Sequence, residues 1–452
     1  MTDPQPVAPP ALVTDLYELT MAAAYQANGI DQQATFELSV RHLPEARRFL
    51  VAGGLDDALA GLEALSFTRD DVAYLAGLDL FPARFLDSLV DLRFTGEVWA
   101  VPEGEVVFAG EPLVRVTGPI VEAQVVETFL LNRIASHTML ASKAARVAIA
   151  SGDRRFLDFA ARRTHGVDSA LATARAAWIA GAAGTSLVAA GARWGIPVSG
   201  TMAHSFVMAF DDEREAFRAY ARTFPRGVVL LIDTYDTVEG AHHAVEVARE
   251  LAGHGVVVAG VRLDSGELAT LATQVRAVLD AAGLTEVDIV ASGDLDEHRI
   301  QELCAAGAPI DAFGVGTQLG TSADAPSLGA VYKLVEDDDG PKMKLATGKV
   351  TLPGRKQVWR GEAGDVVGLQ DDDLPGRPLL GCVMAGGRRT EPAEALDDIR
   401  ARCTTALAGL PDQLRALEPS REPLWPVTAS PRLSALADQV RLGRVAAGHT
   451  GR

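Results

Sequence analysis

Six short apolar runs in the middle of this chain are each followed by a polar or glycine-rich segment that carries reactive residue types. The runs span residues 155–159, 196–198, 228–232, 256–261, 287–290 and 312–313. The segments after them hold a histidine, arginines, aspartates and glycines beside hydroxyl groups. Short buried strands separated by helix-length stretches are typical of parallel sheets, in which the loops after the strands build the active site. We therefore predict one shared pocket at these strand ends, suited to a phosphorylated substrate with a second anionic group.

His204 lies in the segment 200–205, just before an expected amphipathic helix. An imidazole titrates near physiological pH, so it could exchange a proton or accept a phosphoryl group. A histidine at a helix start can equally be satisfied by the backbone alone. Both interpretations stay open on this residue by itself.

Three aspartates and an arginine near strand ends could bind or stabilise charged groups. Arg262 and Asp264 are one residue apart, so their side chains point the same way. Arg262 could bind an anion while Asp264 stabilises a nearby developing cation; a structural ion pair is the alternative. Asp233 and Asp236 could hold Mg²⁺ through water, because hard oxygen ligands suit that ion. For Asp236 we favour a helix N-cap.

Two elements could bind phosphate. Gly314-Val315-Gly316-Thr317 offers backbone N–H groups and a hydroxyl at a late strand end, where α/β barrels often hold phosphate. Glycines also serve in plain turns. Arg162 and Arg163 form a second candidate, with a solvated pair as the alternative. No Walker motif, no GxGxxG and no acidic pair before Thr-Gly is present, so phosphoribosyl chemistry here would need a different fold class.

The composition is that of an acidic protein with enough apolar residues for a large core. The 452 residues include 42 Lys and Arg against 60 Asp and Glu, a formal charge of −18. This balance argues against non-specific binding to nucleic acid and to anionic membrane surfaces. Three widely spaced cysteines and a proline-rich N-terminus without an apolar segment indicate a cytoplasmic protein. The longest uncharged stretch, 176–192, is too weakly hydrophobic to span a bilayer and predicts an internal helix.

The chain is expected to be an α/β protein in three parts. Residues 1–150 predict an N-terminal α+β domain that ends in a bridging helix. Residues 151–335 alternate strands and helices over fewer residues than the roughly 250 of a complete eight-unit barrel. We therefore expect an incomplete or irregular α/β barrel that carries the catalytic residues. Residues 336–452 predict a C-terminal wrapping extension that packs back on the N-terminal domain.

An ordered set of motifs resembles the nicotinate phosphoribosyltransferases, members of the type II phosphoribosyltransferases. The matching segments are Thr14-Asp15-Leu16-Tyr17, Phe36-Glu37, Arg162-Arg163, Gly200-Thr201-Met202-Ala203-His204-Ser205-Phe206, Asp233-Thr234-Tyr235-Asp236, Gly260-Val261-Arg262-Leu263-Asp264-Ser265-Gly266, Gly314-Val315-Gly316-Thr317, Pro326-Ser327-Leu328-Gly329 and Tyr332-Lys333-Leu334. A single one of these motifs would be weak, whereas the ordered set is highly specific.

The resemblance implies a homodimer with shared active sites, in which an incomplete α/β barrel packs on an α/β domain. It implies ATP-assisted transfer of phosphoribose from 5-phosphoribosyl 1-diphosphate to nicotinate, with Mg²⁺, giving nicotinate mononucleotide and diphosphate in NAD biosynthesis. His204 would be transiently phosphorylated by ATP, and Asp264 would support the site beside Arg262.

The resemblance also implies a set of substrate-binding residues. Tyr17 would stack on the pyridine ring from the neighbouring subunit, and Thr201 and Arg262 would contact nicotinate. Phosphate would be held by Gly316, Thr317 and Arg163. Further candidates are Asp233, Gly293, Asp294 and Gly314, with Asp294 as a ribose ligand; no metal ligand is assigned.

Other functions stay open. A nicotinamide phosphoribosyltransferase on the same fold would favour a carboxylate contact to the amide, which Asp264 could make. A quinolinate enzyme should need more basic residues and no phosphorylatable histidine. A lyase- or aldolase-type barrel would use a Schiff-base lysine, and none lies on the six segments. The non-enzymatic alternative is a barrel that binds phosphate ligands without turnover.

Overall fold

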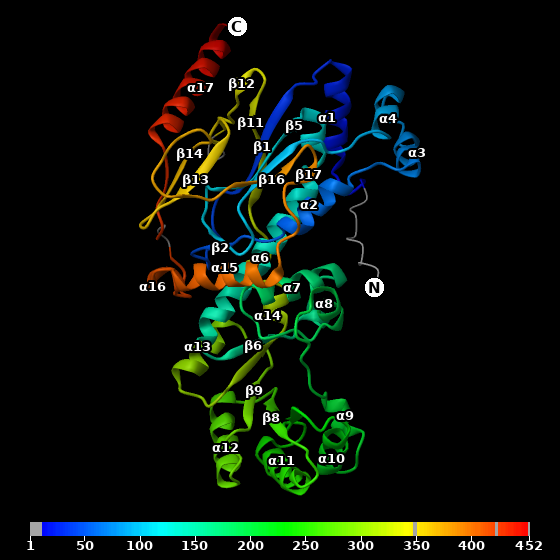
Figure 1. Cartoon of the computed structure of the whole chain (residues 1–452), viewed down its shortest axis with the longest axis vertical. Helices are drawn as coiled ribbons and strands as arrows, with labels where there is room; N and C mark the ends of the chain where they lie inside the picture. The colour runs from blue at the N-terminus through cyan, green and yellow to red at the C-terminus, as the bar shows by residue number, and fades with distance from the viewer. Residues whose placement is uncertain (1–10, 347–349, 421–423, 451–452) are drawn as a thin grey trace. The chain divides into compact units, whose positions relative to one another are not determined.

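The computed structural model of the chain describes residues 11–346, 350–420 and 424–450. Its internal contacts divide the chain into two compact units (Figure 1). Unit 1 combines Met1–Met139 with Ser327–Arg452, and unit 2 is Leu140–Pro326. The N-terminal and C-terminal parts of the chain therefore belong to one unit, and the middle part forms the other.

A seven-stranded antiparallel sheet forms the centre of unit 1 (Figure 1). In order across the sheet, the strands are β12 (Gly340–Pro341), β11 (Ala330–Asp337), β1 (Gln33–Val40), β5 (Pro112–Pro119), β3 (Glu97–Ala100), β16 (Gly381–Ala385) and β17 (Arg388–Arg389). Phe36 of β1 stacks on Tyr332 of β11 with ring centroids 5.0 Å apart. Both rings are buried, so they join an N-terminal and a C-terminal strand in one apolar core.

Helices and two small sheets complete unit 1. The helices are α1 (Leu16–Ala27), α2 (Leu55–Ala64), α3 (Arg69–Gly77), α4 (Ala83–Leu89), α5 (Ile120–Val125), α15 (Leu396–Ala408), α16 (Asp412–Arg415) and α17 (Pro431–Thr450). One sheet has the order β15 (Arg377–Pro378), β13 (Lys356–Arg360), β14 (Asp365–Leu369) and β18 (Val427–Ala429), and the other pairs β2 (Leu50–Val51) with β4 (Val106–Val107). A long helix, α6 (Glu127–Ser151), begins in unit 1 and ends in unit 2.

Unit 2 is built on a five-stranded parallel sheet. Its order is β6 (Arg155–Asp158), β10 (Ala312–Val315), β9 (Asp288–Ala291), β8 (Val258–Leu263) and β7 (Val228–Leu231). The sheet has two edges, at β6 and β7, which confirms the prediction of an incomplete, irregular α/β barrel. Five of the six apolar runs form these strands. The expectation of a strand at 196–198 is wrong: Val198 makes only an isolated bridge to Thr185, because Pro197 has no N–H to donate to a ladder.

Helices connect the parallel strands of unit 2. They are α7 (Val167–Ile179), α8 (Val188–Trp194), α9 (His204–Met208), α10 (Glu213–Thr223), α11 (Thr237–Ala252), α12 (Leu268–Ala281), α13 (Glu297–Ala305), α14 (Thr317–Gly320) and a 3₁₀ turn over Ala161–Arg163. The predicted single helix over 176–192 is wrong, because the chain turns at Gly181, whose φ is +113°, between α7 and α8. No helix in the described ranges is long and apolar enough to cross a membrane.

Candidate active site

A cavity of about 240 Å³ lies at the C-terminal ends of the strands in unit 2. Its lining residues lie at or just after the ends of β6, β8, β9 and β10, and they are Phe159, Arg162, Arg163, Arg262, Asp264, Ser292, Gly293, Asp294, Gly314, Gly316 and Thr317. The structure thus gathers most of the residues singled out in the sequence around one space. Because parallel strands end at the same edge of a sheet, segments far apart in the chain converge there.

Arg262 lies in β8 and is held by a neighbouring hydroxyl. Its Nη1 donates a hydrogen bond to Thr201 Oγ1 at 2.6 Å, and its buried Nε has no hydrogen-bond acceptor among the described residues. Burial lowers the pKa of Arg262, while the carboxylates of Asp264 and Asp233 act in the opposite direction. A partly buried, oriented guanidinium with an unused donor is suited to bind a planar carboxylate.

The backbone and the carboxylate of Asp264 are held from two different strand ends. The backbone N–H of Asp264 donates to Asp233 Oδ2 at 2.9 Å, and the hydroxyl of Ser265 donates to the same oxygen at 2.6 Å. The Asp264 carboxylate accepts a hydrogen bond from Ser292 Oγ at 2.5 Å through its Oδ1. Asp233 does not line the cavity; it anchors the end of β8 instead.

His204 is the first residue of α9, and both of its ring nitrogens face side chains. Nδ1 lies 3.2 Å from Thr234 Oγ1, and Nε2 lies 3.8 Å from Asp264 Oδ2. The ring therefore faces the hydroxyl and carboxylate of two strand ends, and no backbone group of the described residues forms a hydrogen bond with it. This geometry favours the chemical interpretation of His204 over the plain helix-start interpretation.

Two of the arginines that line the cavity, Arg162 and Arg163, are free to bind an anion. Arg162 and Arg163 lie in the exposed 3₁₀ turn after β6, and in the described part of the chain neither guanidinium has a hydrogen-bond or ion-pair partner. The turn is tied to the strand by the buried Asp158, which accepts the Ala160 N–H at 2.9 Å and the Thr185 hydroxyl at 2.7 Å. Burial raises the pKa of Asp158.

Two glycines in the cavity wall are required by close packing. A Cβ on Gly293, whose φ is +93°, would lie 2.0 Å from the carbonyl oxygen of Asp264. A Cβ on Gly314 would lie 2.5 Å from the ring of Phe159. Sequence reasoning missed Phe159; its place directly after β6, one residue beyond the strand end, was the signal that could have found it.

The remaining candidates lie outside this cavity. The carboxylate of Asp236 accepts the N–H groups of Val238 and Glu239, which confirms it as the N-cap of α11. Tyr17 belongs to α1 in unit 1, where 45% of the residue is exposed. Partial burial and the carboxylate of Glu127 raise the pKa of Tyr17.

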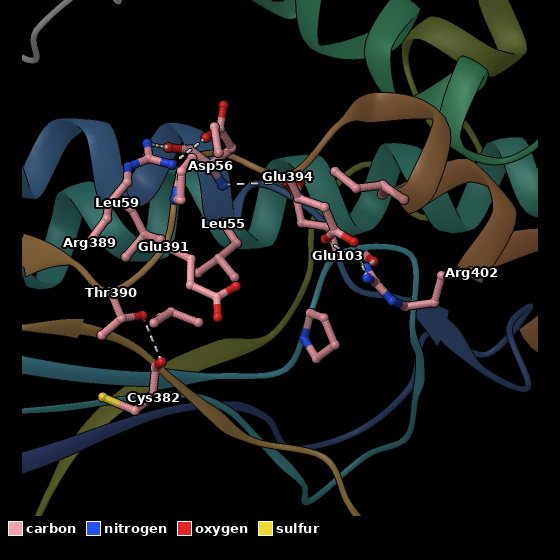
Figure 2. Close-up of a pocket in the computed structure, with 15 residues that line it drawn as sticks. Leu55, Asp56, Leu59, Glu103, Cys382, Arg389, Thr390, Glu391, Glu394 and Arg402 are labelled. Atoms are coloured by element: carbon pink, nitrogen blue, oxygen red, sulfur yellow. Dashed lines mark hydrogen bonds and ion pairs between the residues drawn. The ribbon is translucent and has the colours of Figure 1, made fainter.

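A larger cavity of about 380 Å³ lies in unit 1, and Figure 2 shows that its two arginines are bound by neighbouring acidic residues. Arg389 binds Asp56, with 2.5 Å between Nη1 and Oδ1. Arg402 binds Glu394 and donates to the Glu103 carbonyl oxygen at 2.6 Å. Since both arginines are already satisfied, the smaller cavity of unit 2 is the better candidate for an active site.

The carboxylates of the unit 2 cavity set limits on how a metal could be held. Among the described residues, no three His, Cys, Asp or Glu side chains are placed to hold one ion together. Mg²⁺ is usually bound by one or two carboxylates, water and substrate phosphates. Asp264 and Asp294, which both line the cavity, fit that pattern.

Arginines, aspartates and glycine-rich backbone at the strand ends of an incomplete parallel α/β barrel form the kind of pocket in which α/β-barrel enzymes bind phosphorylated small molecules. Family models sharpen this class. Residues 12–135 match the nicotinate phosphoribosyltransferase N-terminal domain, and residues 154–347 match the nicotinate phosphoribosyltransferase family. The chain belongs to the nicotinate phosphoribosyltransferase family, as its motifs suggested.

Individual relatives agree with the family models over most of the chain. The nicotinate phosphoribosyltransferase pncB2 of Mycobacterium tuberculosis is 48% identical over 447 residues, which cover 98% of this chain and 96% of that protein. The Bacillus subtilis nicotinate phosphoribosyltransferase is 45% identical over 80% of this chain and 77% of its own length. The crystal structure of human nicotinic acid phosphoribosyltransferase matches with a TM-score of 0.84 and 32% identity, covering 94% of this chain and 99% of that one.

Proposed function

We propose that this chain transfers the 5-phosphoribosyl group of 5-phosphoribosyl 1-diphosphate to nicotinate, as a cytoplasmic enzyme of NAD biosynthesis. The pyridine nitrogen forms a bond to the anomeric carbon of the ribose, the bond from that carbon to the diphosphate oxygen breaks, and nicotinate mononucleotide and diphosphate leave. The observation that carries the proposal is the partly buried Arg262, held by Thr201 at a cavity that two further arginines also line.

Nicotinate would be recognised by its carboxylate and its ring. Arg262 offers an oriented donor set to the carboxylate, and Thr201 fixes that orientation through its hydroxyl. Phe159 is the aromatic side chain among the lining residues, so its ring would cover the pyridine. Tyr17 is absent from this lining; we infer that a second copy of the chain supplies it, in a homodimer with shared active sites.

The phosphoribosyl donor would be held by other residues that line the cavity. Arg162 and Arg163 can bind phosphate oxygens, and the backbone at Gly316 and Thr317 offers N–H donors. As diphosphate leaves, positive charge develops on the ribose, and the carboxylate of Asp264 stabilises it. Mg²⁺, when bound, neutralises the leaving diphosphate.

ATP would take part in the reaction by phosphorylating His204. Phosphoryl transfer from ATP to the imidazole breaks the bond between the γ-phosphorus and its bridging oxygen and forms a phosphorus–nitrogen bond, with release of ADP. Oδ2 of Asp264 lies 3.8 Å from Nε2 of His204. A change of charge on the histidine therefore changes the electrostatic potential at the carboxylate that would face the ribose. This contact supports coupling of ATP hydrolysis to turnover.

A substrate comparison tests the proposal. Diphosphate release would be measured with 5-phosphoribosyl 1-diphosphate and either nicotinate, nicotinamide or quinolinate, with and without ATP. We expect turnover with nicotinate and stimulation by ATP. Preference for nicotinamide would make the chain a nicotinamide phosphoribosyltransferase, and no diphosphate release with any base would leave a phosphate-binding barrel. A lyase is disfavoured because no lysine is among the lining residues of this cavity.

A further inference from the structure

Ser292 is a buried hydroxyl at the end of β9 that the motif analysis did not single out. It is 3% exposed and lines the cavity of unit 2. Its Oγ donates a hydrogen bond to Asp264 Oδ1 at 2.5 Å, and its backbone N–H donates to the carbonyl oxygen of Leu263 at 2.8 Å. Ser292 thus joins the ends of two neighbouring strands at the carboxylate that faces the substrate.

We infer that Ser292 is a positioning residue for Asp264. Its hydroxyl holds one carboxylate oxygen, Oδ1, and leaves the other, Oδ2, turned toward Nε2 of His204 at 3.8 Å. This inference rests on the proposed transfer reaction, in which Asp264 stabilises positive charge on the ribose. It adds that the orientation of Asp264 is set from β9, outside its own strand.

The backbone next to Ser292 fixes the position from which its hydroxyl reaches Asp264. Gly293 packs so tightly on the end of β8 that a Cβ there would lie 2.0 Å from the Asp264 carbonyl oxygen. The Ser292 N–H bond to Leu263 fixes the same strand end. Because neither contact depends on a flexible side chain, the serine hydroxyl has little freedom to move away from the carboxylate.

Among the described residues, Ser292 makes the one hydrogen bond to the Asp264 carboxylate, and His204 Nε2 lies farther away at 3.8 Å. The backbone N–H of Asp264 is held by Asp233, but that bond leaves the carboxylate free to rotate. A hydroxyl that donates to an ionised carboxylate is among the stronger hydrogen bonds in proteins. Removing the Ser292 donor should therefore disorient Asp264 while leaving Arg262 and Thr201 in place.

The test compares Ser292→Ala and Ser292→Thr with the unmodified enzyme. We expect kcat of Ser292→Ala to fall about tenfold or more, both with and without ATP, while KM for nicotinate stays within about twofold. Ser292→Thr keeps a hydroxyl donor and should recover most of kcat. A matched control is Ser151→Ala, which removes another buried serine hydroxyl of unit 2, bonded to Val147 O at 2.8 Å, and should leave kcat unchanged.

Each outcome is decisive. An unchanged kcat in Ser292→Ala overturns the inference, as does a loss of kcat that Ser151→Ala reproduces together with the same drop in Tm. If Ser292→Ala does not fold, Ser292→Cys keeps a similar volume with a much weaker donor, and full kcat in that variant overturns the inference. If the unmodified enzyme releases no diphosphate with nicotinate, the proposed function has failed and not the role of Ser292.

Discussion

Replacing Arg262 by lysine isolates the geometry of the guanidinium from its charge. Lysine keeps a cation in β8 but loses the planar donor set that matches a carboxylate and the hydrogen bond to Thr201 at 2.6 Å. A hydrogen bond to a charged group contributes about 1.5–3 kcal/mol. Loss of one such bond to nicotinate lowers kcat/KM for nicotinate by about 10- to 150-fold.

The same substitution should change selectivity as well as rate. Nicotinamide carries a neutral amide, so it gains less from a charged, bidentate partner, and its kcat/KM should change by less than about threefold. The assay is formation of the mononucleotide from each base at saturating 5-phosphoribosyl 1-diphosphate. Arg214→Lys serves as the control, because Arg214 is engaged by Asp212 at 2.7 Å on α10 and does not line the cavity.

Two results would refute this reasoning. If Arg262→Lys retained both its KM for nicotinate and its preference over nicotinamide, Arg262 would not recognise the carboxylate. If KM for 5-phosphoribosyl 1-diphosphate rose in place of KM for nicotinate, the guanidinium would bind phosphate. If the control Arg214→Lys lost kcat/KM for nicotinate and preference over nicotinamide to the same extent, the loss would indicate an effect on folding.

Three further predictions follow from single contacts. Thr234→Val removes the hydroxyl 3.2 Å from Nδ1 of His204 and should weaken ATP stimulation while ATP-independent turnover persists; intact stimulation would contradict this role. Gly293→Ala should cost about 2 kcal/mol or more of unfolding free energy and abolish activity, whereas Gly195→Ala, also at positive φ but in open space, should cost less. Burial, with a neighbouring carboxyl, raises the pKa of Glu111 above its unfolded value near 4.3, so its contribution to stability is full at lower pH and is lost as pH rises through the folded value. The Tm should therefore fall as pH rises above the unfolded value, and Glu111→Gln should flatten that change; an equal slope in both proteins would contradict it.

Strand identity in unit 2 could be predicted because each run is short, apolar and separated from the next by a helix-length stretch. That pattern placed β6, β7, β8, β9 and β10 and put their polar ends at one edge. It failed at 196–198, where the apolar run includes Pro197, which has no N–H to donate to a strand ladder. It also failed at 176–192, where composition suggested a helix but Gly181 takes a left-handed backbone conformation.

Contacts between strand ends were harder to predict than the strand ends themselves. Arg262 and Asp264 could be paired from their spacing, because alternate residues of a strand share a face. The partners of these two residues, Thr201 and Ser292, lie 61 and 28 positions away along the chain. The parallel register of β8 and β9 brings Ser292 within hydrogen-bond distance, and Thr201 reaches Arg262 from an irregular segment before α9; no spacing rule contains either arrangement.

The net charge of the whole chain is a poor guide to the charge of its active site. A formal charge of −18 argues against polyanionic partners, yet the unit 2 cavity is lined by three arginines and two aspartates. In unit 1, acidic residues are partly used to neutralise arginines, as at Arg389 and Arg402 (Figure 2). The arginines of the 3₁₀ turn after β6 have no such partners in the described ranges. A small anion responds to these nearby unpaired charges, because a distant surface charge is screened within about 10 Å at ordinary ionic strength. A phosphorylated substrate and an acidic protein are therefore compatible, provided that the cations at the cavity stay unpaired until the substrate arrives.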